Sequence, residues 1–158
     1  MKNQSLLFTC SINTLQETQK WALILAALLE KFDVVALKGN LGAGKTTFAR
    51  FLIQQLTSLQ EEVPSPTFTL VQSYETNKGP LFHFDCYRLE HPYEALELGI
   101  EDSFTTGISL IEWPEKIEIF LPQNTLLLDF EAGPTRHLKI YGNKRWEERL
   151  NPFLCSQS

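Results

Sequence analysis

Residues 33–48 read DVVALKGNLGAGKTTF, and this stretch decides the fold. The run from Asp33 to Lys38 consists mainly of strand formers, is too short for a helix, and is apolar enough to be buried on both faces, as the inner strands of a parallel sheet are. The segment from Gly39 to Thr46 follows without a break and matches G-x-x-x-x-G-K-[ST] at every fixed position. An amphipathic stretch that runs to about Ser58 begins directly after it. This order predicts an α/β fold in which a glycine loop joins a buried parallel strand to a helix.

The glycine loop has the chemistry of a phosphate-binding site. At a helix N-terminus, unpaired backbone N–H groups and the positive end of the helix dipole both point at a bound anion, and glycines keep side chains away from it. We expect Lys45 to bridge the β- and γ-phosphates of a nucleotide and Thr46 to place its hydroxyl on Mg²⁺. The alternative is a glycine turn that precedes a helix and carries an incidental lysine. The predicted nucleotide contacts in this segment are Gly39, Asn40, Leu41, Gly42, Ala43, Gly44, Lys45, Thr46 and Thr47.

Periodicity predicts the remaining elements. Thr14 and Glu17 have the spacing of a capping box, so a helix should begin there and run to about Lys31, with an apolar stripe that ends at Phe32. The other expected elements are strands at 5–10, 68–75, 81–85, 108–112, 125–130 and 136–141, a short helix at 93–98 and a short polar helix at 144–150. The fold class that follows is a P-loop NTPase-like, three-layer α/β fold whose mixed sheet has a parallel centre and an antiparallel extension.

Composition describes one ordinary domain, which we expect to span residues 1–158. The three cysteines are far apart and form no C-x-x-C pair, which argues against a disulfide framework or a zinc site and favours the reducing cytoplasm. No apolar run approaches the roughly 20 residues of a membrane helix, so we expect no membrane association. The formal net charge of −5 argues against a domain that grips nucleic acid through a broad basic face of its own.

Two acidic residues follow apolar runs and are candidates to complete the phosphate site. Asp85 follows LFHF at 81–84, and Glu112 follows ISLI at 108–111. Because the carboxyl ends of parallel strands face a bound ligand, either acid suits a second magnesium ligand or a group that orients the attacking water. A surface acid at a strand end is the alternative for each. His83 is expected to be a half-buried strand residue, since no second His or Cys lies at ligand spacing.

Three further features bear on the ligand. The stretch SPTF at 65–68 sits where many phosphate-loop proteins keep a switch segment, so Thr67 is a candidate contact to the γ-phosphate or its metal, with a plain proline-bounded loop as the alternative. The guanine-reading pattern N-K-x-D is not met, because Asn77-Lys78 runs into Gly79-Pro80, and this favours ATP. The arginines form no compact cluster of the kind that closes over the substrate of a small-molecule kinase.

Taken together, the motifs resemble those of the TsaE family, bacterial ATPases once called YjeE. The likeness is carried by GNLGAGKTTF at 39–48, SPTFTLV at 65–71, HFDCYRL at 83–89, ELGIEDSF at 97–104 and ISLIEWPEK at 108–116. The resemblance implies an ATPase that works with TsaD and TsaB in making threonylcarbamoyladenosine in tRNA. It further implies that ATP turnover resets the TsaB–TsaD pair, and that tRNA is an indirect partner through that complex.

The resemblance also implies roles for individual residues. Lys45 and Asp85 correspond to functionally important residues of the family and are the predicted catalytic residues. Thr46 and Glu112 correspond to the residues that hold magnesium, and Trp113 corresponds to the tryptophan beside the metal-binding acid. These positions, with ATP and Mg²⁺ as cofactors, are the expected active site.

The end of the chain adds one candidate and leaves two rival functions open. Pro134-Thr135-Arg136 loosely matches the Gly-Arg ending of the family, which makes Arg136 a candidate nucleotide contact. Turnover should be slow in the isolated protein, because the sequence offers no evident arginine finger. The rivals are a P-loop small-molecule kinase and a nucleotide-gated adaptor in which hydrolysis is incidental.

Overall fold

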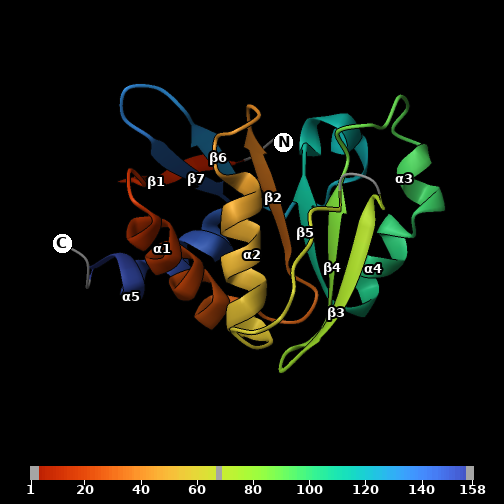
Figure 1. The fold of residues 1–158 in the computed structure, drawn as a ribbon, viewed down its shortest axis with the longest axis horizontal. Coiled ribbons are helices and arrows are strands. Elements are labelled where there is room, and N and C mark those ends of the chain that lie inside the picture. The colour runs from red at the N-terminus through yellow and green to blue at the C-terminus, as the bar shows by residue number, and fades with distance from the viewer. Residues whose placement is uncertain (1–3, 67–68, 156–158) are drawn as a thin grey trace.

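The structure, a computed structural model, describes residues 4–66 and 69–155 (Figure 1). Within these residues seven strands form one mixed sheet, in the order β1-β7-β6-β2-β5-β4-β3. The strands are β1 Ser5–Ser11, β2 Val34–Gly39, β3 Val71–Thr76, β4 Gly79–Asp85, β5 Ile108–Glu112, β6 Leu126–Glu131 and β7 His137–Gly142. Strand β2 lies at the centre because all four of its residues from Val34 to Leu37 are buried and can be covered on both faces.

The sheet has the predicted parallel centre and antiparallel extension. Strands β6, β2, β5 and β4 run parallel to one another, while β1, β7 and β3 join the two edges in antiparallel pairs. Glu112 pairs with Leu37 on one side and with Asp85 on the other. The carboxyl ends of β2, β5 and β4 therefore meet at one edge of the sheet, where the glycine loop begins.

Helices cover both faces and give three layers. The helices are α1 Leu15–Leu28, α2 Lys45–Leu56, α3 Glu94–Glu97, α4 Ile100–Thr106, the 3₁₀ helix η1 Pro114–Phe120 and α5 Lys144–Cys155. Apolar residues of α1, α2 and α5 share one buried cluster, and residues of α3, α4 and η1 share the cluster on the opposite face. Figure 1 shows α1 and α2 side by side on one face of the sheet.

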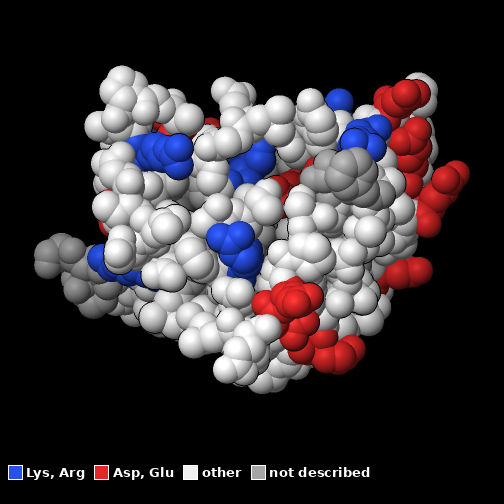
Figure 2. All heavy atoms as spheres, viewed as in Figure 1, with Lys and Arg blue, Asp and Glu red and all other residues white. Residues whose placement is uncertain are grey.

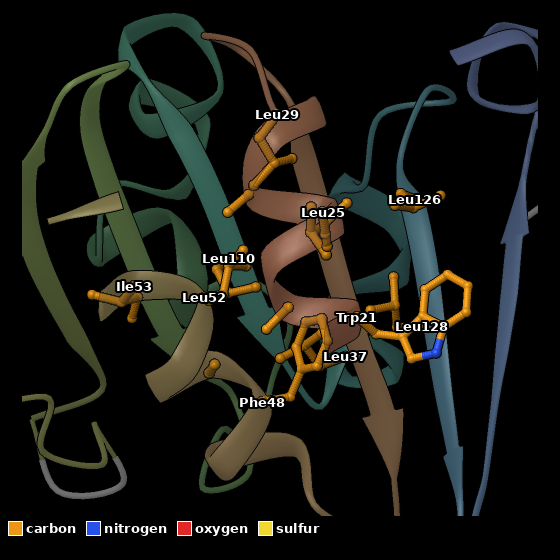
Figure 3. Close-up of a cluster of buried hydrophobic side chains, with 14 of the residues drawn as sticks. Trp21, Leu25, Leu29, Leu37, Phe48, Leu52, Ile53, Leu110, Leu126 and Leu128 are labelled. Atoms are coloured by element: carbon orange, nitrogen blue, oxygen red, sulfur yellow. The ribbon is translucent and has the colours of Figure 1, made fainter. Parts of the chain in front are cut away.

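The larger core anchors the helix that follows the glycine loop. Phe48, Leu52 and Ile53 of α2 have no exposed surface and belong to the same buried cluster as Leu37 and Leu110 of the sheet (Figure 3). Burying a side chain of this size contributes about 1.5–3 kcal/mol, so these contacts fix α2 and the loop before it on the sheet. The position of the candidate site thus follows from the apolar stripe of α2.

Helix α1 begins where the sequence predicts and ends earlier. The capping box is present, with the Thr14 hydroxyl accepting from the Glu17 N–H and the Glu17 carboxylate accepting from the Thr14 N–H. The last helical residue is Leu28, three residues before the predicted end. The prediction that Phe32 continues the apolar stripe is wrong: Phe32 has a left-handed φ of 77° and is 53% exposed, because the chain turns there to enter β2.

Other differences from the expected elements reflect short or weakly patterned segments. The predicted helix at 93–98 is the four-residue α3, and the structure adds α4, which starts after Gly99 at a φ of 81°. The predicted strand at 68–75 begins instead at Val71, because Leu70 has a left-handed φ of 67°; residue 68 lies outside the described residues. The last helix, expected to end at residue 150, continues through Pro152 to Cys155. These segments carry too few apolar residues to mark their ends.

Candidate functional site

A cavity of about 270 Å³ opens at the sheet edge where the glycine loop lies. Its walls come from the loop, the start of α2, and the carboxyl ends of β4 and β5. The lining residues are Leu41, Gly42, Ala43, Gly44, Lys45, Thr46, Thr47, Asp85, Tyr87, Glu112, Trp113 and Arg136. Most of the residues that the sequence singles out are thus brought around one hollow.

Two glycines of the loop have conformations that other residues rarely adopt. Gly44 caps α2 with a left-handed φ of 109°, so the chain enters the helix with its first N–H groups at the cavity. Gly39 has a φ of 149°, and a Cβ there would lie 2.6 Å from the backbone oxygen of Phe130. The loop therefore needs glycine for its torsions and for its close approach to strand β6.

Lys45 is held at the base of the loop and is buried, with 5% of its surface exposed. Its ammonium donates to the Gly39 carbonyl and, at 3.4 Å, to the Asn40 carbonyl. It also lies 3.7 Å from the centre of the Trp113 ring, in the geometry of a cation–π contact. Burial lowers the pKa of Lys45, and Glu112 is the strongest of the nearby acids that act in the opposite direction.

A chain of three polar side chains links α2 to strands β5 and β4. The Thr46 hydroxyl donates to Glu112 Oε1 at 3.0 Å, and Glu112 Oε2 lies 2.7 Å from His83 Nε2. Glu112 is 1% exposed. The prediction that His83 is half-buried is wrong, since it has no exposed surface and its ring contacts the Glu112 carboxylate. Sequence spacing missed this contact because His83 and Glu112 come from different strands.

Asp85 and Trp113 complete the wall opposite the loop. Asp85 is 5% exposed, and its Oδ1 accepts from the Tyr87 N–H at 3.0 Å. Trp113 has a left-handed φ of 60°, which is unusual for a bulky residue and costs about 1–3 kcal/mol. This turn directly after β5 brings the indole over Lys45 and against the Tyr87 ring, whose centroid is 4.9 Å away.

A second hollow of about 150 Å³ adjoins the first on the side of α1. Ala43, Gly44, Thr47 and Arg136 line both hollows. The other walls are residues that the sequence reasoning did not propose as functional: Ile12, Asn13, Thr14, Leu15 and Thr18. The capping box predicted where α1 begins, but only the strand pairing shows that this end of the helix lies beside the loop.

The remaining predicted positions lie elsewhere. Gly39 and Asn40 line a separate hollow of about 370 Å³ on the other side of the loop, together with Asp129 and Glu131. There burial raises the pKa of Asp129. Thr67 lies outside the described residues. Among residues 4–66 and 69–155, no three His, Cys, Asp or Glu side chains are grouped so as to hold a metal by themselves. No helix in the same ranges combines the length and the apolar character needed to cross a membrane.

A glycine loop between a central parallel strand and a helix, on a mixed sheet covered on both faces, defines the P-loop NTPase-like class of folds. A family model, "Threonylcarbamoyl adenosine biosynthesis protein TsaE", matches residues 12–139. The chain belongs to the TsaE family, whose members act in the biosynthesis of threonylcarbamoyladenosine in tRNA.

Individual relatives agree with this membership. The chain is 40% identical over 121 residues to the tRNA threonylcarbamoyladenosine biosynthesis protein TsaE of Rickettsia felis, an alignment that covers 77% of this chain and 71% of the relative. It is 41% identical over 112 residues to the protein of that name from Bacillus subtilis, covering 70% and 69% of the two chains. The crystal structure of Bacillus subtilis YdiB superposes with a TM-score of 0.76 at 29% identity, over 99% of this chain and 97% of that one.

Proposed function

We propose that this protein is a Mg²⁺-dependent ATPase that supports threonylcarbamoyladenosine formation in tRNA by acting on a TsaB–TsaD complex. ATP hydrolysis resets that complex between rounds of modification. The observation that carries the proposal is the contact of the Thr46 hydroxyl with Glu112 at the N-terminus of α2, inside a cavity walled by the glycine loop. This is the arrangement that a phosphate-bound magnesium site requires.

The triphosphate would be held by the loop and by Lys45. Backbone N–H groups at the start of α2 supply donors for phosphate oxygens, and the helix dipole favours the negative charge. Lys45 would exchange the carbonyls of Gly39 and Asn40 for the phosphates, which satisfy its ammonium better because they are charged. The adjoining hollow beside α1 is the natural place for the ribose and the base, since it shares Thr47 and Arg136 with the phosphate cavity.

The donor set fits magnesium. Thr46 and Glu112 offer two oxygen ligands, and magnesium is usually held by one or two carboxylates together with phosphates and water. Among the described residues no three His, Cys, Asp or Glu side chains are grouped to hold the ion alone, so phosphate and water would supply its remaining ligands. When bound, the ion would neutralise the negative charge that develops on the phosphates during hydrolysis.

Asp85 is the residue we assign to orienting the attacking water. Its carboxylate is nearly buried, lines the cavity, and lies next to Glu112 in the strand register. Arg136 is exposed at the rim that the two hollows share. Its guanidinium can approach a bound phosphate there, but in the part of the chain that the structure describes no contact fixes it over the γ-phosphate in the way that an arginine finger is fixed. We therefore expect slow turnover alone and faster turnover once the partner complex orders the site.

The surface charge supports an indirect relation to tRNA. Acidic side chains gather over α3 and α4, where Glu94, Glu97, Glu101 and Asp102 lie, and again toward the lower edge of the face seen in Figure 2, where Lys and Arg are scattered singly. Because nucleic-acid affinity rests mainly on basic side chains that contact phosphates, such a surface favours a protein partner in between. The reaction would take place in the cytoplasm, with the modified tRNA held by the TsaB–TsaD pair.

The test compares wild type with Lys45→Ala, and uses Lys144→Ala, an exposed lysine at the start of α5, as the matched control. Release of inorganic phosphate from ATP and formation of threonylcarbamoyladenosine are measured with and without TsaB–TsaD and tRNA. We expect Lys45→Ala to fold and to lose both activities, and Lys144→Ala to keep them. An active Lys45→Ala protein would refute the assignment.

The same assay separates the two rival functions. Phosphate transferred to a metabolite in place of free inorganic phosphate would identify a kinase. A variant such as Asp85→Asn is expected to bind ATP without hydrolysing it. If that variant still supports tRNA modification, the protein is a nucleotide-gated adaptor.

A further inference from the structure

His83 is a polar residue at an apolar position of strand β4. Leu81 and His83 share one face of the strand, because side chains alternate along it. Their partners on β5, Ile108 and Leu110, belong with Leu81 to the core beneath α1 and α2. The sequence thus places an imidazole where the core pattern favours another aliphatic side chain.

The imidazole meets a carboxylate that is itself buried. His83 Nε2 lies 2.7 Å from Glu112 Oε2, and neither residue exposes more than 1% of its surface. An ionised carboxylate accepts hydrogen bonds only, so in the arrangement proposed below Nε2 carries the ring proton and donates it to Glu112. Nδ1 has no hydrogen-bond partner among the described residues. The contact with Glu112 is therefore the polar interaction that explains an imidazole at this place.

The two oxygens of Glu112 have separate partners. Oε2 accepts from His83, which leaves Oε1 to accept from the Thr46 hydroxyl at 3.0 Å. A hydrogen bond on the far oxygen fixes the rotation of the carboxylate and keeps it beside Thr46.

We propose that His83 is a positioning residue: its Nε2–H holds the Glu112 carboxylate so that Oε1 and the Thr46 hydroxyl are set for magnesium before Mg–ATP arrives. The inference rests on the proposed function, because it concerns the same metal and nucleotide site. It adds a residue that touches neither ligand and acts through Glu112. Groups that orient a metal ligand in this way typically change metal affinity by about 10–100-fold when they are removed.

The test measures the affinity for ATP by calorimetry, once with Mg²⁺ and once with EDTA, and takes the ratio of the two dissociation constants. The variants are His83→Phe, which keeps a ring without the donor, and His83→Gln, whose amide can replace the Nε2–H. Leu81→Val is the matched control, since it perturbs the same face of β4 one step further from Glu112. A second measurement needs no variant: long-range ¹H–¹⁵N spectra of the full wild-type chain report which ring nitrogen of His83 carries the proton.

We expect His83→Phe to lower the magnesium-dependent gain in affinity by about 10–100-fold, with affinity in EDTA little changed. His83→Gln should recover most of the gain, Leu81→Val should keep it, and the spectra should place the proton on Nε2. A folded His83→Phe protein with the wild-type ratio, or a bare Nε2 in the spectra, would overturn the positioning role alone. Failure of the wild-type protein itself to bind Mg–ATP would overturn the proposed function and the inference with it.

Discussion

Lys78 closes the C-terminal end of helix α1 from a distant part of the chain, and replacing it should destabilise the protein. Lys78 lies in the β3–β4 turn, and its ammonium donates to the carbonyls of Ala26 at 2.8 Å, Ala27 at 3.0 Å and Leu29 at 2.6 Å. Helix α1 has no basic residue in its own last turn, so Lys78 supplies the positive charge that the helix dipole favours there. The same contact fixes the turn from which β4 carries His83 and Asp85 to the site.

The magnitude follows from these contacts. Hydrogen bonds to a charged donor contribute about 1.5–3 kcal/mol net, and since Lys78 is only partly buried we expect Lys78→Met to lose no more than one such contribution. For a chain of this size, about 1.5–3 kcal/mol corresponds to a fall in melting temperature of about 3–12 °C. The structure implies little direct effect on nucleotide affinity, because the turn is at the opposite end of β4 from Asp85.

Urea unfolding followed by circular dichroism, together with calorimetry, measures the loss. Lys144→Met is the control, because it makes the same change in net charge at an exposed position. An unchanged midpoint for Lys78→Met, or an equal fall in both variants, would show that the three carbonyl contacts do not stabilise the protein.

Three further predictions concern the site and its surroundings. Glu112→Ala should reduce the magnesium-dependent affinity for ATP by at least about tenfold, measured by titration with and without Mg²⁺, and an unchanged affinity would count against its place on the metal. Arg136→Ala should raise the dissociation constant for ATP by no more than about fivefold, the value expected for an exposed charge at the rim of the site, while the melting temperature stays the same. Burial raises the pKa of the Cys86 thiol from 9.0 to about 12, so above pH 9 the unfolded chain loses this proton and the folded chain keeps it. Deprotonation of this thiol in the unfolded chain should therefore lower the free energy of unfolding by about 1.4 kcal/mol between pH 7 and pH 10. Urea titrations of Cys86→Ala should lack that part of the pH dependence.

The amino-acid sequence by itself determined the features that depend on neighbouring residues. The glycine loop, its position between strand and helix, and the capping box of α1 are all patterns within a few residues, and torsion and hydrogen bonding act over that range. The carboxyl-edge placement of Asp85 and Glu112 could also be predicted, because an acid after a buried parallel strand has only one edge to occupy. Short segments such as α4 were missed, since a single turn or two of helix carries little periodicity.

Tertiary structure alone decided the contacts between residues that are far apart in the chain. Thr46 and Glu112 are separated by 66 positions, His83 and Glu112 by 29, and Lys78 and Ala26 by 52. The sequence predicted Thr46 and Glu112 as site residues and His83 as a half-buried strand residue. Only the register of β4 beside β5 shows that His83 is the partner of Glu112. The physical reason is that a buried polar group must find its partner across the sheet, and which group lies opposite is set by strand order and register, which no local pattern specifies.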